Sequence, residues 1–193
     1  MFCNNGNYEF FLKKYDLYLS PVVDTYAYCL LGNHFHLLVR IKTQQDLINF
    51  HQQQDLTTFK KLSNLKLSNL PKTAHDIISH QFRKFFQSYA MAFNKQQNRT
   101  GTLFQTPFKR ALVNDDSYFT RLIYYIHANP QVHGLIEDFK EWQWSRYQRM
   151  LIEKQTKLKK ETVLDWFGNK QLFEKYHNIQ NEIASDTSLF IED

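Results

Sequence analysis

The sequence predicts an α+β fold, built from an antiparallel sheet and several amphipathic helices. Residues 22–31 and 34–41 are rich in β-branched and aromatic side chains, and they flank Gly32-Asn33, a dipeptide that favours a hairpin turn. Between residues 74 and 97, aromatic side chains recur at helical spacing instead. The chain has 193 residues, of which 42% are hydrophobic, so it can bury the core of one domain.

The first element expected is a helix at residues 8–19, capped by Asn7 and ended by Ser20-Pro21. The hairpin follows. A polar helix is expected at residues 43–55, and residues 55–72 read as a variable insertion. This insertion contains the tandem copy Lys-Leu-Ser-Asn-Leu at residues 61–70, and two short copies are too few for a repeat architecture.

The helix at residues 74–97 is the most regular part of the sequence. Its aromatic stripe indicates core packing and comprises Phe82, Phe85, Phe86, Tyr89 and Phe93. Residues 102–113 read as a strand, which Pro107 would confine to a sheet edge or a bulge.

A further helix is expected at residues 117–129, with Asp115 and Asp116 at its positive end and Pro130 as its stop. Beyond it, aromatic side chains suggest a hydrophobic clasp, made by Trp142, Trp144 and Tyr147. Two short helices are expected at residues 161–167 and 170–179, and the chain is expected to fray from residue 184.

Composition narrows the functional classes. The net charge is +5 and the pI is about 9.1, which fits a polyanionic partner without requiring one. Cys3 and Cys29 show no metal or redox spacing, which suggests a reducing, cytosolic setting. No apolar run approaches the ~18 residues of a membrane span, so no membrane partner is expected.

A His-x-His pair opens the second strand. Alternate side chains of a strand share a face, so His34 and His36 are expected on one face, opposite Phe35. Two imidazoles so placed can bind one metal ion. The alternative is that both are ordinary strand residues.

The helix at residues 117–129 offers a second candidate pair. Tyr125 and Asn129 are four residues apart and therefore share a helical face. An Asn side-chain oxygen can bind a hard metal ion. Without the histidines, the alternative is that Tyr125 is a packing residue and that Asn129, which precedes Pro130, only ends the helix.

Taken together, these motifs resemble a known family. Gly-Asn-His-Phe-His followed much later by Tyr-Ile-x-x-Asn-Pro is similar to the single-tyrosine HUH transposases, and most similar to the REP-associated tyrosine transposases. The likeness covers about residues 2 to 150. The intervening family-like stretches are Phe86-Gln87-Ser88-Tyr89, Phe93-Asn94-Lys95, Gly101-Thr102-Leu103-Phe104, Pro107-Phe108-Lys109-Arg110 and Trp144-Ser145.

The resemblance implies a ferredoxin-like antiparallel sheet with helices on one face. Residues 1–150 would form the catalytic domain and residues 151–193 a C-terminal helical appendage. Relatives have a strand before the first helix, and this N-terminal strand is expected to be missing here, since residue 1 falls where it would have ended.

The resemblance also implies roles. His34 and His36 match the metal-binding histidines, Tyr125 the nucleophile, and Asn129 a third polar ligand. Tyr124 lies about 100° round the helix from Tyr125. His127 is two residues after Tyr125, so it is expected to point away from it and to have a structural role. The family metal is Mg²⁺ or Mn²⁺, while ligand type alone also allows Zn²⁺.

The implied activity is metal-dependent nicking and rejoining of single-stranded DNA through a 5′-phosphotyrosine, at DNA hairpins. The protein would act as a monomer or homodimer in the cytoplasm, associated with the bacterial nucleoid. The basic residues expected to hold the DNA backbone are Arg40, Lys42, Arg83, Lys84, Lys95, Arg99, Lys109, Arg110 and Arg121.

Two other functions compete with this one. The first is a hairpin-DNA-binding descendant of the same family that has lost catalysis, which the short N-terminus favours and the intact His-His-Tyr-Asn set opposes. The second is a metal-dependent hydrolase with His-x-His on a barrel strand, which needs ~250 residues and repeated βα units that this chain lacks.

Overall fold

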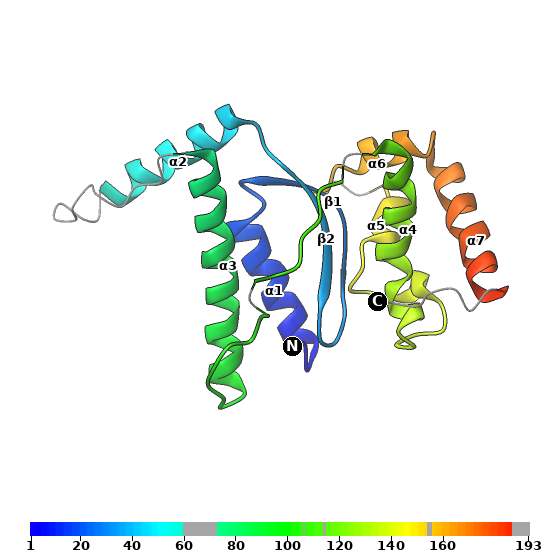
Figure 1. The fold of residues 1–193 in the computed structure, drawn as a ribbon, viewed down its shortest axis with the longest axis horizontal. Coiled ribbons are helices and arrows are strands. Elements are labelled where there is room, and N and C mark those ends of the chain that lie inside the picture. The colour runs from blue at the N-terminus through cyan, green and yellow to red at the C-terminus, as the bar shows by residue number, and fades with distance from the viewer. Residues whose placement is uncertain (60–72, 106, 114, 154–155, 187–193) are drawn as a thin grey trace. The chain divides into compact units, whose positions relative to one another are not determined.

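The computed structural model describes residues 1–59, 73–105, 107–113, 115–153 and 156–186. Its described residues form a two-stranded antiparallel sheet and seven α-helices, which confirms the predicted α+β class (Figure 1). The chain divides into two compact units. The first unit comprises residues 1–24 and 40–108, and the second comprises residues 25–39 and 109–193.

The hairpin consists of β1 (Val23–Leu30) and β2 (Phe35–Ile41), close to the predicted ranges. The Leu31 N–H donates to the His34 carbonyl at 2.9 Å, which closes the turn around Gly32 and Asn33. His34 therefore lies at the last turn position, directly before β2, and the strand itself begins one residue later than predicted.

In the first unit, α1 (Asn5–Tyr18) packs against α3 (Ala74–Gln96), as the blue and green helices of Figure 1 show. The predicted cap is corrected: the Asn4 side chain accepts from the Asn7 N–H at 3.1 Å, so α1 begins earlier. Asn7 is buried inside the helix, where its Nδ2 donates to Gln96 Oε1 at 2.6 Å. Asn7 thus ties α1 to α3 instead of capping a helix.

The aromatic stripe on α3 forms the core of this unit, as predicted. Phe85, Tyr89 and Phe93 are buried, and the Phe11 ring of α1 lies 4.9 Å from Phe85 and 5.2 Å from Tyr89, centre to centre. Both contacts are edge-to-face, the geometry that aromatic pairs favour.

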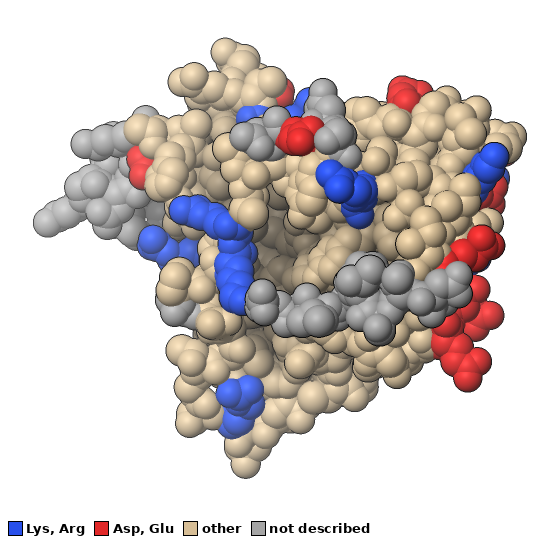
Figure 2. Space-filling model, turned by 45° about the vertical axis from the view of Figure 1, so that its right-hand side comes forward, with Lys and Arg blue, Asp and Glu red and all other residues tan. Residues whose placement is uncertain are grey.

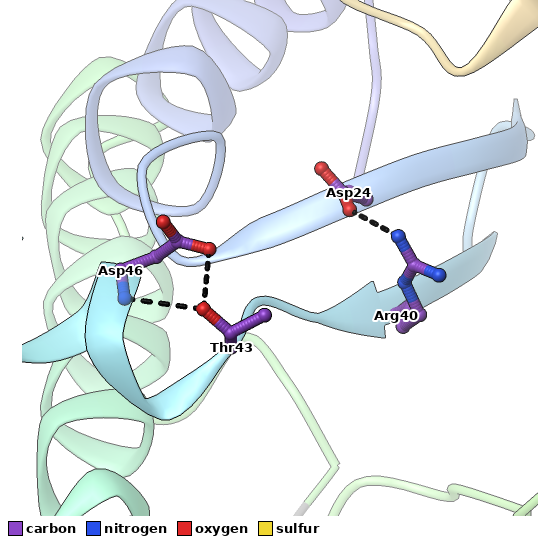
Figure 3. A network of polar contacts seen from close by, with 4 residues as sticks. All are labelled: Asp24, Arg40, Thr43 and Asp46. Atoms are coloured by element: carbon purple, nitrogen blue, oxygen red, sulfur yellow. Dashed lines mark hydrogen bonds and ion pairs between the residues drawn. The ribbon is translucent and has the colours of Figure 1, made fainter.

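The second helix, α2 (Gln44–Phe59), is longer than predicted, so residues 56–59 are helical. The tandem copy at residues 61–70 lies outside the described residues. Thr43 begins the helix: its Oγ1 accepts from the Asp46 N–H and donates to Asp46 Oδ2 (Figure 3). Nearby, Arg40 of β2 forms an ion pair with Asp24 of β1 at 2.9 Å.

The strand predicted at residues 102–113 is wrong. The described residues of this range, 102–105 and 107–113, contain no strand. Pro107 supplies no N–H for a ladder. The side chains from Phe108 to Leu112 are exposed, so this stretch has no face to bury against a sheet.

In the second unit, α4 (Asp116–Val132) continues through Pro130, which corrects the predicted stop. The helix ends two residues later in a Schellman motif. Leu135 N–H donates to the Pro130 carbonyl at 2.8 Å, Gly134 N–H donates to the Gln131 carbonyl at 2.9 Å, and Gly134 has φ +64°. Glycine at the left-handed position, rather than proline, therefore sets the end of this helix.

Four shorter or later elements complete the unit: η2 (Phe139–Glu141), α5 (Tyr147–Leu151), α6 (Lys160–Trp166) and α7 (Lys170–Asp186). The sequence prediction missed α5 and made α7 too short. The core of the unit joins the hairpin to these helices through buried side chains such as Leu38, Ile123 and Phe173.

The predicted clasp at residues 142–147 holds the second edge of β1. Trp142 Nε1–H donates to the Leu30 carbonyl at 2.9 Å, and the Leu30 N–H donates to the Trp144 carbonyl at 3.0 Å. The Arg146 N–H donates to the Tyr28 carbonyl. This edge of β1 is therefore hydrogen-bonded rather than open to another strand.

No helix in the described part of the chain combines the length and apolarity that crossing a membrane requires.

Candidate functional site

The two histidines of the His-x-His motif lie together at the start of β2. Their ring centres are 5.1 Å apart and both side chains are half-buried. His36 shares its face of β2 with Leu38, which is buried in the core that contains Ile123 and Ile126 of α4. The histidine face is therefore the face that packs toward α4.

Tyr125 of α4 lies against this pair. Its ring centre is 5.6 Å from that of His36, with the rings nearly perpendicular at 77°. Asn129 follows one turn later and is fully buried, with Nδ2 3.5 Å from the Tyr125 carbonyl. The structure thus brings His34, His36 and Tyr125 into ring contact, and Asn129 lies on the same face of α4.

The structure separates Tyr125 from its neighbour Tyr124. Tyr124 is 4% exposed and packs in the core, 6.0 Å from the Phe139 ring centre and 5.6 Å from that of His177. Burial raises the pKa of Tyr124 to about 12. Tyr125 is only partly buried, so of the two tyrosines it is the more accessible.

His127 has the structural position that the sequence predicts. It is fully buried, and its Nδ1 lies 3.1 Å from Nε2 of His177 in α7. His177 Nδ1 must donate its hydrogen to the Phe173 carbonyl, 2.8 Å away, because a carbonyl only accepts. His177 Nε2 therefore accepts from His127 Nδ1–H, and the pair ties α4 to α7.

His133 is a neighbour that the sequence prediction missed. Its ring centre lies 5.0 Å from that of His34, and the side chain is exposed. His133 follows Asn129 by four residues, and its N–H donates to the Asn129 carbonyl at 3.0 Å. Tyr125, Asn129 and His133 thus form one stripe, a signal that the sequence contains once Pro130 is not read as a helix stop.

The residues present fit a divalent cation. Asn129 Oδ1 is buried and has no hydrogen-bond partner among the described residues, so its lone pairs are available to a ligand. Two imidazoles that share an ion through nitrogens about 2.1 Å from it have ring centres roughly 5 Å apart, as His34 and His36 do.

In the described part of the chain, no group of three or more His, Cys, Asp or Glu side chains is placed to hold a metal ion. A cation here would therefore depend on the two imidazoles and the Asn129 amide, without a carboxylate or thiolate.

The predicted DNA-binding residues fall in both units. The first unit contains Arg40, Lys42, Arg83, Lys84, Lys95 and Arg99, and the second contains Lys109, Arg110 and Arg121. Figure 2 shows lysine and arginine side chains at the surface of the face that it draws. Some of the nine have partners in the protein, since Arg40 pairs with Asp24, and Arg99 donates to the Thr102 carbonyl at 3.2 Å.

Comparison with known proteins identifies a relative of this chain. A Haemophilus influenzae protein named "Putative REP-associated tyrosine transposase" is 28% identical over 149 residues, which is 77% of this chain and 69% of that protein. No family model matches the sequence, and no solved structure matches it significantly. The relative confirms the family resemblance that the motifs indicate.

Proposed function

We propose that this chain, a relative of the REP-associated tyrosine transposases, nicks and rejoins single-stranded DNA with Tyr125 as the nucleophile and a divalent metal ion as cofactor. We also propose a substrate that contains a DNA hairpin, by resemblance to the family. The observation that carries the proposal is the contact between Tyr125 and His36, which come from different elements and lie 5.6 Å apart, ring centre to ring centre.

The nucleophile in this proposal is the Tyr125 hydroxyl. Its oxygen attacks the scissile phosphorus, a P–O bond forms, and the bond from phosphorus to the 3′ oxygen breaks. The products are a 5′-phosphotyrosine and a free 3′-hydroxyl, while the phenol proton leaves to water and the departing oxygen takes up a proton. Because the phosphodiester energy is kept in the new bond, a 3′-hydroxyl can later reverse the step without ATP.

A tyrosine hydroxyl has an ordinary pKa of about 10 and is a weak nucleophile unaided. His34, His36 and Asn129 would hold the ion beside it. When bound, Mg²⁺ or Mn²⁺ supplies Lewis-acid polarisation of the phosphate and offsets negative charge in the transition state. The Asn129 amide suits this task, since its Oδ1 is buried without a hydrogen-bond partner in the described part of the chain.

The protein scaffold supplies position. Tyr125 is held by a helix whose buried residues, Ile123 and Ile126, lie in the same core as Leu38 of β2. Asn129 follows on the same helix. A nucleophile and its metal ligands on packed elements lose little freedom when the substrate binds, and this positioning lowers the barrier to the displacement.

The test uses single-stranded oligonucleotides that form hairpins, taken from inverted repeats beside the gene. The full chain is incubated with labelled DNA and Mn²⁺, with and without EDTA, and resolved on a denaturing protein gel. A DNA-shifted band that EDTA abolishes is expected. Tight binding of the same hairpins without any covalent band would contradict catalysis and favour a descendant that only binds DNA.

A further inference from the structure

We infer that Asn33 is a positioning residue that selects the metal-binding nitrogen of His34. Its side-chain oxygen holds His34 in the tautomer with hydrogen on Nδ1, which leaves the lone pair on Nε2. This inference rests on the proposed function, because it concerns the same metal site.

The key contact is a short hydrogen bond in the hairpin turn. His34 Nδ1 lies 2.7 Å from Asn33 Oδ1. A carboxamide oxygen only accepts hydrogen bonds, so Nδ1 must be the donor. A neutral imidazole has one N–H and one lone pair, so the lone pair of His34 is on Nε2.

The rest of the ring is restrained as well. The His34 carbonyl accepts from the Leu31 N–H at 2.9 Å, which fixes the backbone at the base of the side chain. The His133 ring packs edge-to-face against the His34 ring, at 75° and 5.0 Å between centres. These contacts restrain the ring, and the hydrogen bond to Asn33 decides which of its nitrogens carries the hydrogen.

An acceptor on the far nitrogen of a histidine ligand has two effects. It fixes the orientation of the ring, and it increases the basicity of the nitrogen that binds the metal. Loss of such an acceptor typically lowers metal affinity by about 10- to 100-fold. The free ring would instead favour the tautomer with hydrogen on Nε2, which blocks that nitrogen.

Three variants of the full chain test the inference. Asn33→Ala removes the acceptor, Asn33→Asp keeps an acceptor oxygen, and Asn49→Ala changes an exposed asparagine of α2 as the matched control. Two measurements are made on each: Mn²⁺ affinity by isothermal titration calorimetry, and the tautomer of His34 in metal-free protein by long-range ¹H–¹⁵N NMR, with His34→Gln to assign the signal.

In the unsubstituted protein the NMR pattern is expected to show hydrogen on Nδ1 of His34. Asn33→Ala should shift the pattern toward hydrogen on Nε2 and lower Mn²⁺ affinity about 10- to 100-fold. Asn33→Asp should keep both properties, as should Asn49→Ala. An Asn33→Ala protein with unchanged tautomer or unchanged Mn²⁺ affinity overturns the inference.

Failure of the inference is distinguishable from failure of the proposed function. If the unsubstituted protein forms the covalent DNA adduct while Asn33→Ala keeps its Mn²⁺ affinity, the function stands and the role of Asn33 is wrong. If no adduct forms but Asn33→Ala loses the tautomer and the affinity, Asn33 has its role and the nicking activity is wrong.

Discussion

The ring of His133 packs edge-to-face against the ring of His34, with 5.0 Å between their centres. His133 is the last residue before Gly134, whose left-handed backbone ends α4. The position of His133 therefore depends on where this helix stops. Asn129 and Tyr125 lie one and two turns earlier on the same stripe, so the end of α4 is coupled to the candidate site through the helix itself.

Gly134→Ala is expected to destabilise the protein by about 1 kcal/mol, because an L side chain at φ +64° is strained although nothing lies within 4 Å of the added Cβ. The free energy of unfolding from urea titration measures this effect. Gly32→Ala is the control, since Gly32 has no positive φ and its Cβ would also meet open space. Equal stability of the two variants would contradict the Schellman end of α4.

Stability is expected to fall as the pH drops from about 6.5 to about 4. Burial lowers the pKa of His177 to about 4, and burial also lowers the pKa of His127 well below its ordinary value. Between these pH values the two histidines bind protons in the unfolded chain but stay neutral in the folded chain. A lower pH therefore favours unfolding. His177 alone contributes a loss on the order of 3 kcal/mol by pH 4, and none above pH 6.5.

Urea unfolding between pH 7.5 and pH 4.5 measures this loss. Replacement of both members of the pair, His127→Leu with His177→Leu, should flatten the dependence over this window. His75→Ala removes an exposed histidine and should leave the dependence unchanged. A protein whose stability is constant from pH 7.5 to pH 4.5 would contradict the buried neutral pair.

Asn129→Ala is expected to lower Mn²⁺ affinity about 10-fold while it changes stability by less than about 1 kcal/mol. The stability effect is small because Asn129 Oδ1 makes no hydrogen bond within the described residues. Calorimetric Mn²⁺ titration and urea unfolding separate the two effects. Asn94→Ala is the control for Mn²⁺ affinity, since Asn94 Oδ1 is also buried without such a partner but lies in the other unit. A large loss of stability with unchanged Mn²⁺ affinity would make Asn129 structural.

Lys109 and Arg110 are expected to contact DNA phosphates. Both are exposed and follow Phe108, an aromatic side chain that is 44% exposed. Each substitution to Ala should weaken single-stranded DNA binding and reduce the salt slope of log K by about 0.7 for each lost phosphate contact. Lys175→Ala removes an exposed charge on α7 and should change neither quantity. An unchanged salt slope for both Lys109→Ala and Arg110→Ala would remove this segment from the interface.

The sequence alone predicted those elements in which the spacing of apolar side chains indicates which face is buried. The aromatic stripe of α3 and the hairpin around Gly32-Asn33 follow directly from side-chain period and turn chemistry. The prediction failed where the same residue type is compatible with two different local structures. Pro130 can end a helix or lie inside its last turn, and only the hydrogen bonds that use Gly134 decide between these outcomes.

The candidate site also contains features that the sequence predicted and features that it did not. The motif spacing predicted that His34 and His36 would lie together, and their rings are 5.1 Å apart. His133 escaped prediction because the expected helix ended too early. The side-chain bond between Asn33 and His34 depends on rotamers within one turn, which the sequence does not specify.

The proposed function depends on a covalent bond between Tyr125 and DNA, and two neighbouring variants test whether that bond forms. Tyr125→Phe and Tyr124→Phe each remove one hydroxyl, the first from the ring that contacts His36 and the second from a residue buried in the core. Each protein is incubated with labelled single-stranded hairpin DNA and Mn²⁺ and then denatured. We expect the covalent band to vanish in Tyr125→Phe and to persist in Tyr124→Phe. A covalent band that survives in Tyr125→Phe would show that Tyr125 is not the nucleophile.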